Sequence, residues 1–121
     1  TRFHRALHAR NVVLNANLRY VDDHRRELTE KYKSFDVFKE TFEIPKFVID
    51  GILEEGQKLN IKPRDDEELN KTLDYMKMQL KALVARDLWG MDEYFSIMNE
   101  SSAIVQAAVK LLSSDNLLTS K

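Results

Sequence analysis

Apolar residues recur at the spacing of an α-helix along most of this chain. Within residues 2–32, four of them lie seven positions apart: Leu7, Leu14, Val21 and Leu28. Seven residues make about two helical turns, so these side chains share one face of a helix. No Gly or Pro interrupts the stretch. The pattern therefore predicts one long first helix over residues 2–32.

A short second helix is predicted next. Ser34 is a suitable N-cap, because its hydroxyl can accept a hydrogen bond from a backbone N–H of the first turn. Phe35, Phe38 and Phe42 follow at positions that share one helical face. Pro45 ends this helix, since the residue before a proline is pushed out of the α region.

Two further helices are predicted in the middle of the chain. Residues 46–60 form the third, although Gly51 and Gly56 each weaken it by about 1 kcal/mol relative to alanine. The fourth is the clearest, because Asp65 and Glu68 have the spacing of a capping box at its start. Its apolar stripe consists of Leu69, Leu73, Met76, Leu80 and Leu83.

The fourth helix is predicted to end at Gly90, which can adopt the left-handed conformation that stops a helix. Asp92 is a candidate cap for a short fifth helix. Asn99 or Ser101 is a candidate cap for a last helix. The apolar residues of that last helix are Ile104, Ala108 and Leu111.

The composition favours the same all-α fold. The 121 residues include three Gly and two Pro, whereas average usage would supply about fourteen. Folds rich in strands need these residues for their turns. We therefore expect a bundle of five or six helices, the first and fourth longest, in a single domain over residues 1–112. Residues 113–121 predict a frayed polar tail. Because Thr1 lies directly inside a helical pattern, we expect a processed protein or a piece of a longer one.

Charge and cysteine content exclude several classes of function. The 19 basic and 20 acidic residues nearly balance, which gives no support to general polyanion binding. The absence of Cys excludes disulfides and zinc–thiolate sites. No run of about 18 apolar residues is present, so we expect no membrane span. Residues 1–20 contain four arginines and no carboxylate, but the later helices are acidic or mixed, so nucleic-acid binding is a minor alternative.

The histidines and carboxylates predict no metal and no cofactor. His4 and His8 share a helix face, but Arg5 stands where the zinc-peptidase motif requires a glutamate. On one straight helix, His24 lies about 160° away from His8 and cannot complete a site with it. The acidic cluster at 65–68 suits a helix N-terminus better than a catalytic cleft.

The serines predict no nucleophile. None of the seven serines stands in a Gly-rich turn, and a catalytic serine needs a base and an oxyanion hole usually built from such a turn. Three scattered glycines also cannot form a phosphate-binding loop or a dinucleotide fingerprint. We therefore expect no catalytic residue in this chain.

Two runs of the sequence resemble a known family. Residues 80–112 read LKALVARDLWGMDEYFSIMNESSAIVQAAVKLL, and residues 18–42 read LRYVDDHRRELTEKYKSFDVFKETF. Together they resemble the C-terminal helical region of the bacterial carboxyl-terminal processing (tail-specific) serine peptidases, over roughly residues 2–112. The most specific feature is the order ARDLWGM, EYF, NE and a small apolar helix.

The resemblance implies a non-catalytic module of a larger peptidase. In that family, a core with a PDZ domain grips the C-terminal tail of a substrate protein, and a Ser nucleophile with a Lys base cleaves it. No residue here matches those motifs, so the resemblance places the dyad outside this chain. It implies a periplasmic or cell-envelope parent in a Gram-negative bacterium. Its implied partners are the peptidase core, other copies of the chain and the parent's protein substrates. A stand-alone helical adaptor or dimerisation module is the alternative.

Two sets of residues are candidates for protein contacts. The first is an apolar block around the predicted glycine stop, which packs the fourth helix on the fifth or receives a partner. It consists of Trp89, Met91, Tyr94 and Phe95. The second is a basic and apolar face of the first helix, expected to meet the parent protein. It consists of Arg2, Phe3, Arg5, Leu7 and Arg10.

Overall fold

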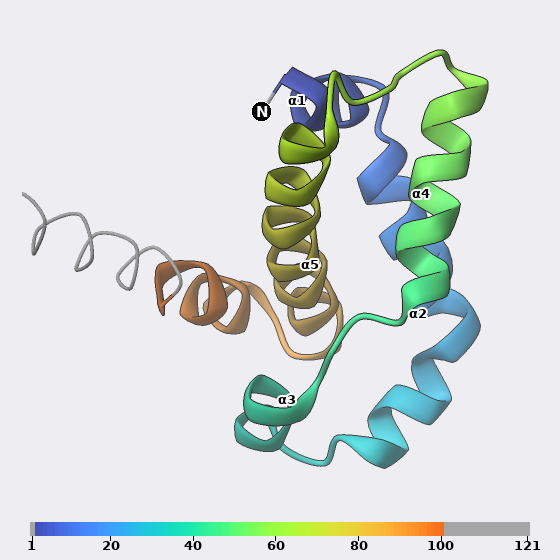
Figure 1. The fold of residues 1–121 in the computed structure, drawn as a ribbon. Helices are drawn as coiled ribbons and strands as arrows, with labels where there is room; N and C mark the ends of the chain where they lie inside the picture. Colours follow the sequence, from blue (N-terminus) through green and yellow to red (C-terminus); the bar gives the residue numbers. More distant parts are fainter. Residues whose placement is uncertain (1, 101–121) are drawn as a thin grey trace, which may run out of the picture.

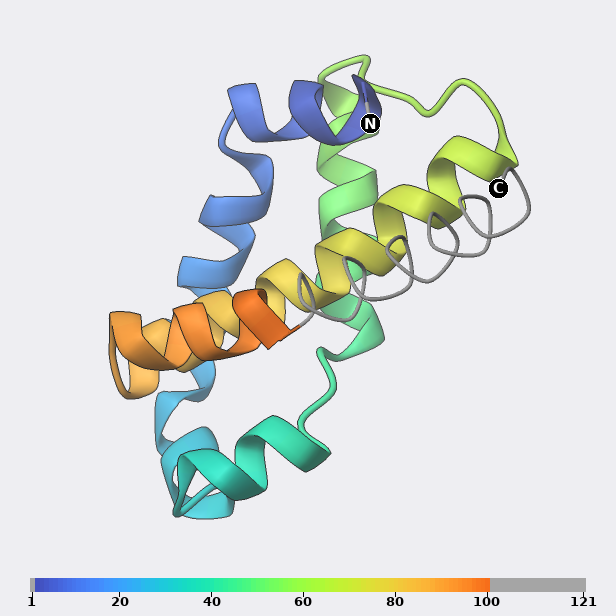
Figure 2. The same ribbon diagram turned by 90° about the vertical axis from the view of Figure 1, so that its left-hand side faces the viewer.

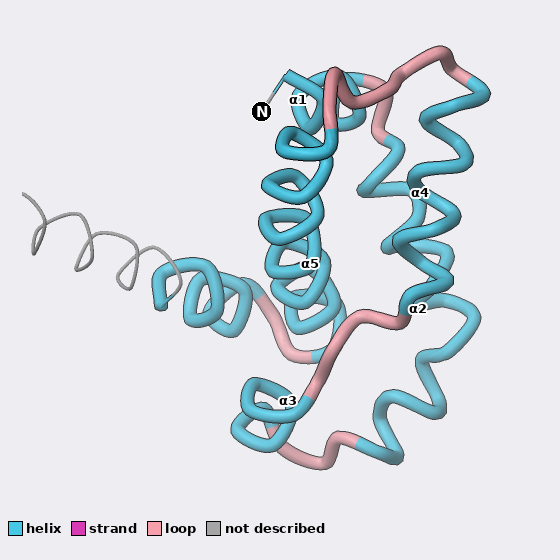
Figure 3. Tube along the Cα trace, in the orientation of Figure 1, coloured by secondary structure: helices cyan, strands magenta, loops and turns pink. Residues whose placement is uncertain are grey.

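The chain folds into helices joined by loops (Figure 1). The computed structural model describes residues 2–100, and between them no strand occurs (Figure 3). The helices are α1 (Arg2–Ala9), α2 (Val12–Lys31), α3 (Phe35–Thr41), α4 (Lys46–Lys58) and α5 (Asp66–Leu88). Residues 91–100 are helical as well. The predicted all-α fold is confirmed. The predicted last helix around Ile104 and the tail 113–121 lie outside the described residues.

The prediction of one helix over residues 2–32 is wrong, because the chain breaks between α1 and α2. Asn11 adopts φ 58° and ψ 24° there, a left-handed conformation that asparagine tolerates better than most residues. Leu7 and Val21 lie on either side of the break, and both are buried. The apolar stripe therefore continues across the break, and the periodicity does not reveal where the helix is interrupted. The first helix therefore has eight residues, and the longest are α2 with 20 and α5 with 23.

The body of the bundle consists of α2, α4 and α5. α2 and α4 lie side by side and run in opposite directions, and α5 crosses them (Figure 2). α1 covers one end of this body and contacts both α2 and α5. α3 lies at the opposite end, near the last turns of α5 (Figure 1). α1 and α3 thus close the two ends of the body.

The core draws side chains from all five helices. Its most deeply buried apolar members are Leu7, Val13, Val21, Phe38, Ile52, Met76, Leu80 and Val84. Each such side chain stabilises the fold by about 1.5–3 kcal/mol relative to an exposed one. The predicted stripe of the fourth helix is therefore correct at its centre, whereas Leu69 and Leu73 at its start are only half-buried.

The N-caps predicted at Ser34 and Asp65 are confirmed. The Ser34 hydroxyl accepts a hydrogen bond from the Val37 N–H at 3.3 Å. The Asp65 carboxylate accepts one from the Glu68 N–H at 2.9 Å. The Glu68 carboxylate in turn accepts from the N–H of Arg64 at 2.8 Å, one residue before the cap. Asp65 and Glu68 thus form a reciprocal pair, in which each carboxylate accepts a hydrogen bond from a backbone N–H near the start of α5.

The end of α5 follows the prediction, but the next cap does not. Gly90 has φ 147°, a backbone conformation that favours glycine. Asp92 is not a cap, because the helical segment already begins at residue 91. Asn99 lies inside the same helical segment, and the other candidate cap, Ser101, lies outside the described residues.

Candidate functional site

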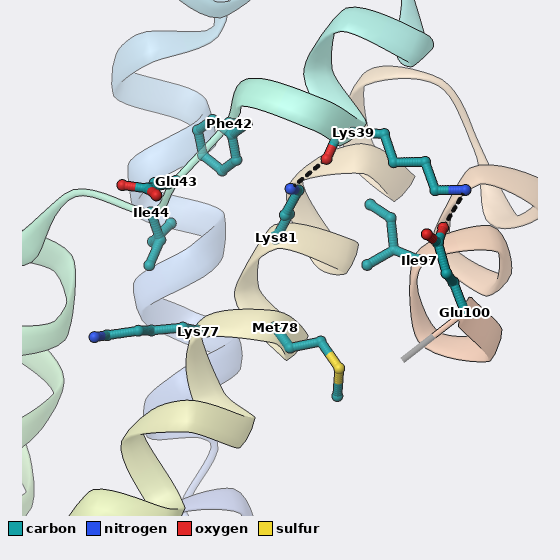
Figure 4. A pocket seen from close by; sticks show the side chains of 9 residues that line it. All are labelled: Lys39, Phe42, Glu43, Ile44, Lys77, Met78, Lys81, Ile97 and Glu100. Carbon is teal, nitrogen blue, oxygen red and sulfur yellow. Dashed lines mark hydrogen bonds and ion pairs between the residues drawn. The ribbon is translucent and has the colours of Figure 1, made fainter. Parts of the chain in front are cut away.

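A pocket of about 490 Å³ lies where α3, α5 and the 91–100 segment meet (Figure 4). We call it the lysine pocket. Three lysines, two glutamates and four apolar residues line it: Lys39, Lys77, Lys81, Glu43, Glu100, Phe42, Ile44, Met78 and Ile97. Apolar surface bordered by charges of both signs resembles the lining of a protein contact more than that of a single-ion site.

Lys81 reaches from α5 to the end of α3 (Figure 4). Its Nζ donates a hydrogen bond to the backbone oxygen of Lys39 at 2.5 Å. That carbonyl belongs to the last turn of α3, where unpaired carbonyls favour a cation. Burial lowers the pKa of Lys81, while the nearby carboxylates of Glu43 and Glu100 act in the opposite direction. Lys81 therefore acts as a cap that joins α5 to α3.

Lys39 and Ser96 form a Ser–Lys pair beside this cap. The Lys39 Nζ donates to the Ser96 hydroxyl oxygen at 3.2 Å and also pairs with the Glu100 carboxylate. An ammonium held by a carboxylate has no lone pair with which to accept the serine proton. Ser96 also lies within the helical 91–100 segment, where the surrounding N–H groups bond inside the helix and form no oxyanion hole. The pair joins two elements and does not build a nucleophile.

Trp89 packs into an aromatic cluster on α3. Its ring centroid lies 5.7 Å from that of Phe35 and 5.2 Å from that of Phe38, and both contacts are edge to face. Phe38 is fully buried and also meets the rings of Tyr32 and Phe42. We call these five residues the aromatic joint. Both rings that Trp89 meets belong to α3, a contact that the sequence did not predict.

The other members of the predicted apolar block lie nearer the surface. Met91 and Phe95 are 47% and 49% exposed. Residues four apart share one face of a helix, so the two form an apolar strip, which we call the Met–Phe strip. Tyr94 is half-buried beside it, with its ring 5.4 Å from that of Phe95. The block therefore divides into a packed end at Trp89 and a face open to solvent.

The predicted set on α1 divides in a similar way. Phe3 is 3% exposed and Leu7 is 0% exposed, so both pack inside this chain. Arg2, Arg5 and Arg10 are exposed. Of this set, the arginines are the side chains that another molecule can reach.

Sequence reasoning missed a groove of about 290 Å³ between α2 and α4. Ala16 and Gly51 help to line it, and a Cβ added to Gly51 would meet no atom within 4 Å. Phe47 also lines the groove and is 58% exposed, with its ring 5.9 Å from Tyr20 and 5.7 Å from His24. One feature of the sequence indicates this groove: the small residue Gly51 follows the aromatic residue Phe47 by one helical turn at the start of the third predicted helix.

The histidines occupy two separate places. The rings of His4 and His8 stack with their centroids 6.1 Å apart, whereas His24 stacks on Tyr20 in α2. Between residues 2 and 100, no three His, Cys, Asp or Glu side chains come together in a way that could hold a metal ion.

Comparison with known proteins identifies a family. The model of a family of unknown function, DUF8443, matches residues 3–90, which include α2 to α5 and all of α1 except its first residue. Because this match covers well over half of the chain, the chain belongs to that family. Searches of curated proteins and of solved structures gave no match. In the part of the chain that the structure describes, no helix has the length and apolarity to cross a membrane.

Proposed function

We propose that this DUF8443 member is a non-catalytic helical module of a carboxyl-terminal processing serine peptidase and that it acts through protein contacts. The serine nucleophile and lysine base belong to a core elsewhere in the parent chain. The module binds that core or other copies of itself, or shapes the access of substrate proteins to the core. Its place is the periplasm or cell envelope.

The observation that carries this proposal is that the two runs resembling those peptidases meet in space. In the run 18–42, the aromatic side chains of α3 pack on Trp89, which belongs to the run 80–112. Lys39 of the first run also bonds to Ser96 of the second. Segments that lie far apart in the sequence thus form one structural unit. This is the arrangement expected of two parts of a single family domain.

The chemistry of the lysine pocket supports a non-catalytic role. Its Ser–Lys pair contains an ammonium that is already paired with Glu100, and a serine that lies within a helical segment. Neither feature suits a nucleophile and its base. Lys81, whose pKa is lowered, donates to a backbone carbonyl, so its hydrogen bond closes a helix end instead of facing a substrate.

We assign the contact with the peptidase core to the Met–Phe strip. Methionine and aromatic side chains are enriched in protein interfaces, and Met91 and Phe95 expose about half of their surfaces. The strip begins directly after the Gly90 turn, and Lys39 holds its helical segment against α3. A core domain that contacts this strip would therefore contact a surface fixed to the bundle.

The reading frame that encodes the chain provides the first test. We expect it to encode a peptidase core with a Ser–Lys dyad and a PDZ domain ahead of this module. A frame without such a core would refute the proposal and favour the stand-alone adaptor or dimerisation module. The isolated 121-residue chain should not cleave peptides with free C-termini. Cleavage by the chain would contradict the proposal, and its loss in Ser96→Ala would identify Ser96 as a nucleophile.

The second test uses the full parent chain. Replacing Met91 and Phe95 together by serine should weaken the contact between core and module, since it removes apolar surface from an interface. Limited proteolysis should then cut between the two parts faster. Val37→Ser on α3 is the matched control, because Val37 is also 49% exposed. Equal cleavage rates for the double variant and the control would show that the strip makes no such contact.

A further inference from the structure

We propose that a pocket between α1 and α5 binds a small oxyanion, such as a carboxylate or a tetrahedral sulfate-like or phosphate-like group. The pocket has a volume of about 320 Å³, near the lower end of the range for ligand sites. Its lining residues are His4, Arg5, His8, Ala9, Tyr75 and Gln79. We call it the histidine–arginine pocket. The inference does not depend on the peptidase assignment.

The lining of this pocket offers hydrogen-bond donors and no acidic group. Arg5 presents a guanidinium, His8 presents a ring N–H group, and Tyr75 and Gln79 add a hydroxyl and an amide NH₂. No carboxylate lines the pocket, and residues 1–20 contain no Asp or Glu. An oxyanion only accepts hydrogen bonds, and the forked guanidinium matches its geometry. The lining therefore selects for an anion over a cation or a neutral group.

The side chains of α5 hold one imidazole in place. The Nε2 of His4 donates to the amide oxygen of Gln79 at 2.9 Å, and Gln79 is only 9% exposed. The ring edge of Tyr75 meets the His4 ring at a centroid distance of 4.8 Å. His8 stacks on the other side, with 16° between the two imidazole planes. A lining ordered in this way loses little side-chain freedom when a ligand binds.

The Arg5 guanidinium and the His8 imidazole have no carboxylate partner within the described chain. Between residues 2 and 100, the side chains of Arg5 and His8 make no ion pair and no hydrogen bond. His8 lies in the last turn of α1. From α5, Tyr75 and Gln79 line the same pocket, and neither side chain contains a carboxylate. A bound anion would thus supply the opposite charge that the fold omits.

The test is a titration of the chain with sodium sulfate, followed by NMR of the histidine imidazoles at constant ionic strength. We expect saturable shifts of the His4 and His8 signals. A parallel titration with acetate identifies the source: saturation by acetate supports a carboxylate ligand, and saturation by sulfate alone supports a tetrahedral one.

Two arginines of α1 give a matched pair of variants. Arg5→Gln should weaken binding by about fivefold or more, because it removes a charge-assisted donor from the pocket. Arg2→Gln removes the same charge from the same helix, but Arg2 does not line the pocket, so the loss should stay below about twofold. Equal losses in the two variants, or shifts that never saturate, would overturn the proposal.

Discussion

The two glycines of α4 allow a prediction with opposite expected effects in one helix. Both are helical, but Gly51 is exposed and Gly56 is buried. A Cβ at Gly51 would meet nothing within 4 Å. A Cβ at Gly56 would lie 3.0 Å from a methyl group of Leu7 and 3.2 Å from the backbone oxygen of Ile61. Alanine therefore fits the first position and crowds the second.

The magnitudes follow from two terms. Replacing a helical glycine by alanine stabilises a protein by about 0.5–1 kcal/mol, because the unfolded chain has less freedom to lose. At Gly56, overpacking opposes this gain by about 1–3 kcal/mol. The crowded oxygen is hard to move, since the Ile61 N–H donates to the Gly56 oxygen at 2.7 Å and fixes this turn. Gly51→Ala should thus exceed Gly56→Ala in stability by about 1–3 kcal/mol.

Urea unfolding followed by circular dichroism measures this difference. The midpoint should rise for Gly51→Ala and fall or stay unchanged for Gly56→Ala, with the slope m the same in all three proteins. Equal stabilisation by the two substitutions would refute the reasoning. It would mean that α1, through Leu7, does not pack closely against the end of α4.

Three further predictions concern two buried side chains and one helix cap, and they use the same unfolding assay. Phe38→Ala should cost about 3–5 kcal/mol, because Phe38 is fully buried in the aromatic joint, whereas Val37→Ala at the exposed neighbouring position should change stability by less than about 0.5 kcal/mol. Asp65→Ala should cost about 1 kcal/mol through loss of the N-cap of α5. Asn17→Asp should destabilise the fold more at pH 7.5 than at pH 4.5. Asn17 is fully buried and donates to the Asp87 carboxylate at 3.0 Å, so burial and Asp87 raise the pKa of the new carboxyl in the folded state, and stability falls as the pH rises through that value. A variant that is equally stable at both values would contradict this prediction.

The features that could be predicted from the sequence are local ones. Ser34 and Asp65 each accept a hydrogen bond from an N–H three residues ahead, so a short window of sequence contains both partners. The stripe of the fourth predicted helix and its end at Gly90 are local in the same sense. Propensity and periodicity describe such windows well, and the helices near these residues were predicted with few errors.

The break after α1 and the contacts between helices could not be predicted in this way. Asn11 and Asn60 have φ of 58° and 61°, so asparagines make left-handed turns in a chain with few glycines. An asparagine inside an apolar pattern usually marks the polar side of a helix, and it gives no distinct signal for a turn. The contact from Lys81 to the Lys39 carbonyl joins residues 42 positions apart. A helical pattern contains no information about such a partner.

The dependence of α3 on α5 has a consequence for the order of folding. α3 has seven residues, whereas isolated helices shorter than about 12–15 residues are marginal in water. Its aromatic side chains pack on Trp89, and its last turn is closed by Lys81. α3 can therefore become stable only after the second half of α5 has formed, and its amide protons should exchange with solvent whenever that half opens. The rate of amide exchange in α3 therefore measures how often the end of α5 opens.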